Sequence, residues 1–119
     1  MAKTKNKSEL SQKDYYCEMY KIQYHFFNGT SVESFLNFMN KKFKFKPKDN
    51  LGDGLTVEFV DEEGFVFTVI WVRKKNDYPV VAHECCHAAM NHADSRGLLL
   101  KDGEAICYIV ENLYRKFIS

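Results

Sequence analysis

The chain has 119 residues, of which 45% are hydrophobic, and this size allows one domain with a packed core and excludes a multidomain protein. An aromatic content of 15% argues against a disordered chain, and a formal net charge of +1 gives no indication of a generally basic nucleic-acid-binding protein. No apolar run approaches the length of a membrane span, and no apolar secretory segment follows the polar stretch Met1–Lys7. We therefore expect a cytoplasmic protein.

The first half of the sequence predicts an arm, a strand and a helix. Residues 1–13 are rich in Lys, Asn, Ser and Gln, which is typical of a flexible basic arm, so we expect a single domain over residues 14–119. The aromatic, partly alternating residues of about 15–27 favour a strand. Ser31 is a candidate N-cap for a helix of about 32–43, where apolar residues recur at helical spacing.

The second half predicts a hairpin followed by two helices. The strand-like runs at about 55–60 and 65–72 are joined by the acidic turn Asp61–Gly64, and the second run is apolar enough to be covered on both faces. Helices are expected at about 79–93 and 103–117. The fold class expected is α+β, with a short antiparallel sheet packed on these two helices.

The helix of about 79–93 carries the motif His83-Glu84-Cys85-Cys86-His87, which is a His-Glu-x-x-His pattern. Residues four apart lie on one face of a helix, so both imidazoles can reach one zinc ion. Glu84 would then stand beside the metal and act as a general base on water. The apolar residues on both sides of the motif predict a largely buried helix, in which two histidines and a glutamate without a metal would be costly.

A zinc site needs a third ligand besides the two histidines. His92 and Asp94 fit poorly, because helix geometry places both too far along the axis from His87. Glu104 fits better, since it begins the next predicted helix, although an acidic residue there also complements the helix dipole. Glu111, two turns later, is a weaker candidate. Tyr108, one turn after Glu104, could hold that carboxylate, contact substrate or donate to an oxyanion.

These two motifs resemble zincin metallopeptidases of the gluzincin type. His83-Glu84-x-x-His87-Ala88 followed by Glu104-Ala105-x-x-Tyr108 is similar to small zincins encoded by bacteriophages, over residues of about 55–118. The resemblance implies His83, His87 and Glu104 as zinc ligands, Glu84 as general base, a small zincin-like domain, and the host cytoplasm as the location if a phage encodes the chain.

The cysteines leave an alternative open. Because thiolates bind zinc well, Cys86 or Cys107 could join the histidines in a closed structural site with no place for a catalytic water. The interpretation we favour is that they are small apolar residues that pack helix against helix. Cys85 and Cys86 are helical neighbours and do not face each other, and in a reducing compartment we expect free thiols.

A basic stretch interleaved with phenylalanines follows the first predicted helix. Its lysines could contact nucleic-acid phosphates, or they could be the outward residues of an exposed edge strand with the phenylalanines inward. The residues are Lys41, Lys42, Lys44, Lys46 and Lys48. Trp71 is expected in the core of the hairpin.

The function expected from these patterns is zinc-dependent hydrolysis of peptide bonds in a protein or peptide substrate, including a host protein. Two alternatives stay open. One is a phage-encoded protein that keeps the zincin scaffold without catalysis and inhibits a host protein by binding it. The other is an accessory protein that contacts nucleic acid through the basic stretch.

Overall fold

The computed structural model describes residues 12–45, 51–95 and 103–119. Four strands form one sheet: β1 (Gln12–Cys17), β2 (Ile22–Asn28), β3 (Gly54–Val60) and β4 (Val66–Val72), in the order β1-β2-β4-β3. β1 and β2 form one antiparallel hairpin, and β3 and β4 form another. The sheet therefore has β3 as its last strand on one side.

The sheet is mixed, because the two hairpins meet through a parallel pairing of β2 with β4. This corrects the predicted antiparallel sheet, while the α+β class is confirmed. Parallel strands need a long connection, and here both α2 (Val32–Phe43) and β3 lie between β2 and β4 in the chain.

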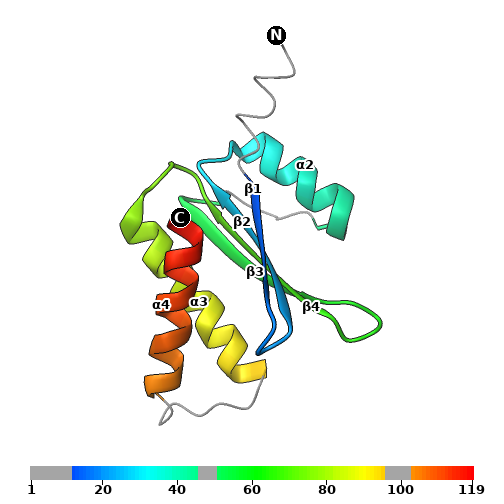
Figure 1. Ribbon diagram of the computed structural model, residues 1–119. Coiled ribbons are helices and arrows are strands. Elements are labelled where there is room, and N and C mark those ends of the chain that lie inside the picture. The colour runs from blue at the N-terminus through cyan, green and yellow to red at the C-terminus, as the bar shows by residue number, and fades with distance from the viewer. Residues whose placement is uncertain (1–11, 46–50, 96–102) are drawn as a thin grey trace.

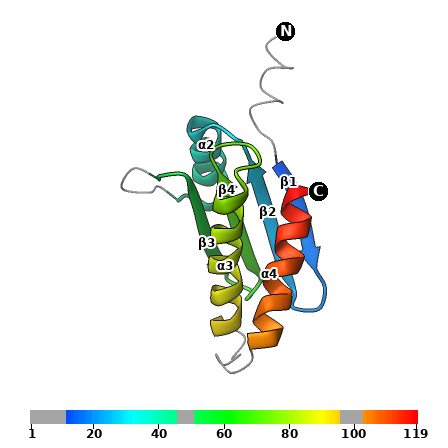
Figure 2. The same cartoon turned by 90° about the vertical axis from the view of Figure 1, so that its left-hand side faces the viewer.

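Three helices cover the sheet on two sides (Figures 1 and 2). α2 lies on one face, and α3 (Tyr78–Ser95) and α4 (Gly103–Ile118) lie side by side on the other, with α3 nearer β3 and α4 nearer β2. All three match the predicted helices to within two residues. The predicted N-cap is also confirmed, because the Ser34 amide donates to Ser31 Oγ at 3.2 Å.

The predicted strand of about 15–27 is in fact the β1–β2 hairpin. Its tight turn is closed by the Lys21 amide, which donates to the Cys17 carbonyl at 2.7 Å, and Lys21 adopts a left-handed φ of 59°. β1 begins at Gln12, so Gln12 and Lys13 of the predicted arm belong to the sheet, and residues 1–11 lie outside the described residues.

Two apolar clusters stabilise the fold, one on each face of the sheet. The first joins the sheet to α3 and α4 and includes Tyr24, Ile70, Cys85 and Leu113. The second lies under α2 and includes Phe27, Phe35, Met39, Val69 and Trp71. β4 contributes to both clusters, as its nearly continuous apolar sequence predicted, and Trp71 is fully buried with its indole N–H donating to the Thr30 carbonyl at 2.8 Å.

The described part of the basic stretch ends a helix and contains no strand. Lys41 and Lys42 lie in the last turn of α2, and Lys44 caps it in a left-handed conformation at φ 53°. Phe43 stacks on Phe59 with ring centroids 4.2 Å apart, so it packs inward at the helix end. The edge-strand interpretation is wrong for these residues, and Lys46 and Lys48 lie outside the described residues. No helix among the described residues is long and apolar enough to span a membrane.

Candidate metal centre

α3 presents its two faces to different surroundings. One face is buried against the sheet and α4 through Val81, Cys85, Ala88 and Ala89. The predicted ligands His83 and His87 lie one turn apart on the exposed side, so the expectation that both histidines are buried is wrong. The helical period therefore separates the packing residues of the motif from its histidines.

The two histidines converge on one point. Their Nε2 atoms are 3.1 Å apart, and their ring centroids are 4.7 Å apart at an interplanar angle of 75°. Two zinc–nitrogen bonds of about 2.0–2.1 Å at a near-tetrahedral angle separate their nitrogens by about 3.3 Å. The spacing thus fits two ligands of one ion, and without an ion one ring can donate to the other.

The Glu84 carboxylate is held in place by strand β3. Glu84 is only 6% exposed, and the Thr56 hydroxyl lies 2.7 Å from its Oε1 and 3.0 Å from its backbone carbonyl oxygen. The absence of a side chain at Gly54 provides the space for this carboxylate. A Cβ at Gly54 would lie 3.0 Å from Glu84 Oε2 and 2.8 Å from Val80 Cγ1. Sequence reasoning missed Thr56 and Gly54, since nothing in the pattern links them to a helix 28 residues further on.

A cavity of about 400 Å³ lies beside these side chains. It is formed where the first residues of β3 meet the first turns of α3, and both His83 and Glu84 line it. Asp53, Pro79 and Val80 complete the lining together with Gly54. Because β3 is the last strand of the sheet, this cavity opens beside a strand edge.

The predicted third ligand lies elsewhere along the helix pair. Glu104 is exposed in the first turn of α4, and α4 runs back alongside α3 (Figure 2). Its start therefore lies near Ser95, the end of α3, which is about 12 Å along the axis beyond His87. Within the described ranges, no group of three His, Cys, Asp or Glu side chains is placed to hold a metal ion.

The other candidate ligands are also accounted for. Glu111 lies further along α4 and accepts a hydrogen bond from Arg115 at 2.7 Å. His92 is 1% exposed, and its Nδ1 is 3.3 Å from the Tyr24 hydroxyl, so it faces the core and not the histidine pair. Asp94 is exposed near the end of α3. Tyr108 is 64% exposed and lines a different cavity, described below.

The cysteines divide between core and surface. Cys85 is fully buried in the first apolar cluster, where desolvation, then the neighbouring Cys86 and Glu84 charges, raises its pKa to about 12. Cys86 and Cys107 are free thiols on the exposed surface. The helix-packing interpretation of Cys86 and Cys107 is therefore wrong, and Cys85 takes that role.

The fold and this site define an α+β protein with a convergent histidine pair and a buried carboxylate at a sheet edge. Comparisons with protein-family models, with curated proteins and with solved structures found no match for the chain. The argument for function therefore rests on the chemistry of these side chains.

Proposed function

We propose that this chain is a small zincin-like, zinc-dependent metallopeptidase that hydrolyses peptide bonds. The observation that carries the proposal is the 3.1 Å approach of His83 Nε2 and His87 Nε2 beside the buried Glu84 carboxylate. The motif helix α3 packs on edge strand β3 and beside α4. The resemblance implies the same arrangement of a sheet, a motif helix and a following glutamate helix.

In this proposal His83 and His87 would hold the zinc ion. The third ligand would be a carboxylate of α4, either Glu104, as the motif resemblance implies, or Glu111 further along the helix. A bound zinc ion supplies a Lewis acid that polarises a carbonyl and makes a water molecule more acidic. Glu84 accepts the proton of the attacking water and passes it to the leaving amine. The Thr56 hydroxyl keeps the Glu84 carboxylate in position for both transfers.

The substrate in this proposal is an extended peptide segment. It lies along the edge of β3 and adds to the sheet through main-chain hydrogen bonds. The cavity at Gly54, His83 and Glu84 then receives the scissile bond. Strand addition of this kind recognises the peptide segment mainly through its backbone.

The test of this proposal is Glu84→Gln in the zinc-loaded protein, assayed on a mixture of quenched fluorescent peptides. We expect wild type to cleave the mixture and Glu84→Gln to lose at least about 100-fold, because a general base contributes 10²–10⁴-fold. Zinc content should be the same in both proteins.

Glu33→Gln is the matched control, because Glu33 lies in the first turn of α2 on the opposite face of the sheet. It should keep the wild-type rate. Cleavage by Glu84→Gln at the wild-type rate, or no cleavage by zinc-loaded wild type, would reject the peptidase mechanism.

A further inference from the structure

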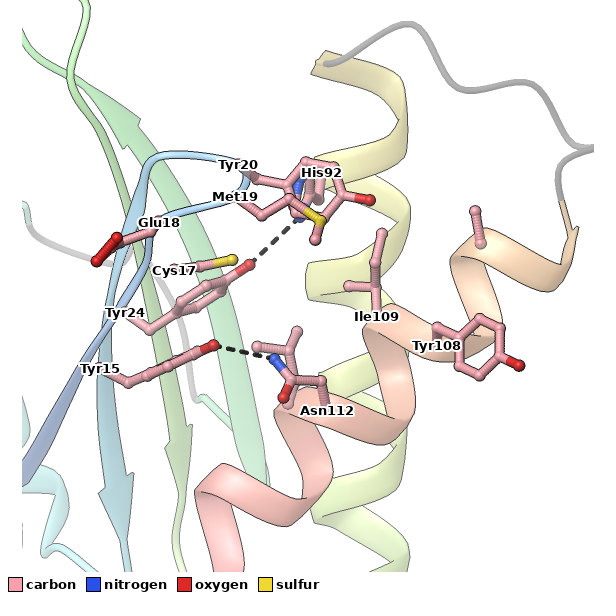
Figure 3. Close-up of a pocket in the computed structure, with 12 residues that line it drawn as sticks. Tyr15, Cys17, Glu18, Met19, Tyr20, Tyr24, His92, Tyr108, Ile109 and Asn112 are labelled. Carbon is pink, nitrogen blue, oxygen red and sulfur yellow. Dashed lines mark hydrogen bonds between the residues drawn. The ribbon is translucent and has the colours of Figure 1, made fainter.

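A second cavity lies between the β1–β2 hairpin and α4 (Figure 3). Its volume is about 520 Å³, within the range of about 300–1,000 Å³ that small-molecule sites occupy. None of its described lining residues also lines the cavity at His83. It is therefore a separate site, and it accounts for Tyr108 and His92, which the candidate metal centre does not use.

The walls of this cavity are flat and aromatic on one side and aliphatic on the other. Tyr15 and Tyr24 project from adjacent strands and stack with centroids 5.8 Å apart at 16°. Ile109 and Leu113 of α4 line the cavity as well (Figure 3 labels Ile109). A slot between an aromatic wall and an aliphatic wall suits a planar ring.

Polar atoms enter this apolar space at two places. The Tyr24 hydroxyl and His92 Nδ1 are 3.3 Å apart, and both residues are only 1% exposed. Closer to the solvent, Asn112 Nδ2 donates to the Tyr15 hydroxyl at 3.2 Å (Figure 3). Because that hydroxyl acts as acceptor, its own hydrogen can be donated to a ligand, and Asn112 Oδ1 can accept from one. A matching ligand carries both a donor and an acceptor.

The charge of the lining residues and the side chains at the mouth of the cavity restrict further which ligands fit. Among the described residues that line it, Glu18 is acidic and none is Lys or Arg. The described lining itself therefore offers a negatively charged ligand no lysine or arginine, and a nearby cation, Lys116 Nζ, lies 5.1 Å from the Tyr15 ring centroid. Met19 is 79% exposed and Tyr108 is 64% exposed, and these two apolar side chains border the cavity on opposite sides.

We propose that this cavity binds an uncharged planar aromatic ring bearing a hydroxyl group, with phenol as the simplest example. Either a free phenolic molecule or the tyrosine side chain of a peptide supplies this chemistry. The ring packs between the tyrosine wall and Ile109, and its hydroxyl exchanges hydrogen bonds with Tyr15 and Asn112. The proposal is independent of the peptidase activity.

The experiment is titration of the isotope-labelled full chain with p-cresol, followed by amide chemical shifts. We expect saturable shifts at Cys17, Tyr20 and Asn112, none at Gly54 or His83, and a Kd below about 1 mM. Toluene, which lacks the hydroxyl, should bind about fivefold more weakly. p-Hydroxybenzoate should bind more weakly than p-cresol because of its negative charge.

A capped Gly-Tyr-Gly peptide distinguishes the two sources. Binding at the same amides at least as tight as that of p-cresol indicates a peptide side chain, and weaker binding or exclusion indicates a free molecule. The absence of saturable shifts with 10 mM p-cresol, or saturable shifts only outside the lining residues, would overturn the proposal.

Asn112→Leu tests the polar contact, and Asn112 is exposed. It should weaken p-cresol binding about fivefold and leave toluene binding unchanged. Asn91→Leu, the same substitution at an exposed position of α3 outside the lining, should change neither affinity. Equal p-cresol affinity in wild type and Asn112→Leu would show that the ring hydroxyl is not recognised as proposed.

Discussion

Individual side chains of the candidate metal centre differ in how far the sequence predicts them. His83 and His87 follow from the four-residue spacing, because a helix brings such residues to one face, and their Nε2 atoms are 3.1 Å apart. The hydrogen bond of Thr56 to Glu84 depends on the packing of β3 on α3. No local sequence pattern predicts that packing, so the contact between Thr56 and Glu84 is found only in the structure.

Asp14 gives a prediction on pH dependence. Its partial burial raises its pKa, but hydrogen bonds from Gln12 and His25 and the charges of His25 and Lys42 outweigh burial and leave the pKa below 3.8. A carboxyl with a lowered pKa stabilises the folded state above pH 3.8, and this contribution is lost as the pH falls through the folded-state pKa.

The check is the free energy of unfolding in urea, measured for wild type and Asp14→Asn between pH 2 and pH 7. Wild type should be the more stable protein at pH 6, and the difference should shrink once the pH falls below about 3.8. A difference that stays constant over the whole range would contradict the role given to the Asp14 charge.

At the scale of elements, the helices and the β3–β4 hairpin are predictable, whereas the first hairpin and the parallel pairing are not. Ser31 and the apolar spacing mark α2, and its cap is present. The β1–β2 turn has no Gly, Pro or Asn between Cys17 and Ile22, and Lys21 adopts the left-handed conformation without such a signal. The pairing of Ile22 with Val66 joins residues far apart in sequence, which periodicity does not encode.

The same long-range packing explains the position of Glu104. A glutamate at the start of α4 is level with the end of α3 when the two helices run antiparallel, and not with His87. The motif in the sequence predicts only that a helix with a glutamate in its first turn follows α3. It does not predict how the two helices are aligned. Zinc content of Glu104→Ala and Glu111→Ala therefore decides which carboxylate, if either, completes the site.

Contact between β3 and α3 at Gly54 gives a prediction for these elements. Gly54→Ala places a methyl group 2.8 Å from Val80 Cγ1 and 3.0 Å from Glu84 Oε2, so the strand, the helix or the carboxylate must shift. We expect a loss of about 1–3 kcal/mol in unfolding free energy and a peptidase rate reduced by at least tenfold.

Gly103→Ala is the matched control, because a Cβ there meets nothing within 4 Å. It should leave the melting temperature and the rate nearly unchanged. If Gly54→Ala behaves like Gly103→Ala in both assays, the close approach at Gly54 does not position Glu84.

At the scale of the whole molecule, the sheet separates two apolar clusters, and the proposed functions lie on the α3–α4 side. The candidate metal centre lies at the β3 edge, and the aromatic cavity lies at the β1–β2 hairpin. Buried residues such as Trp71, Phe35 and Ile70 hold the layers together without a metal. Zinc should therefore add to the stability of a fold that forms without it.

Chelation tests this expectation. Binding of zinc to the folded state alone adds about 2.7 kcal/mol when free zinc is 100 times its Kd. EDTA should then lower the melting temperature of zinc-loaded wild type by about 10 °C and leave a folded apoprotein. His83→Ala should show no such shift, and an unchanged wild-type melting temperature in excess EDTA would contradict a zinc site in the folded chain.

Elemental analysis of purified wild type beside His83→Ala is the most direct measurement of all. The convergence of His83 and His87 predicts about one zinc ion per wild-type chain and almost none in the variant, with both proteins folded by circular dichroism. Equal zinc in the two proteins, or none in wild type after incubation with zinc, would contradict the assignment of this histidine pair as a metal site.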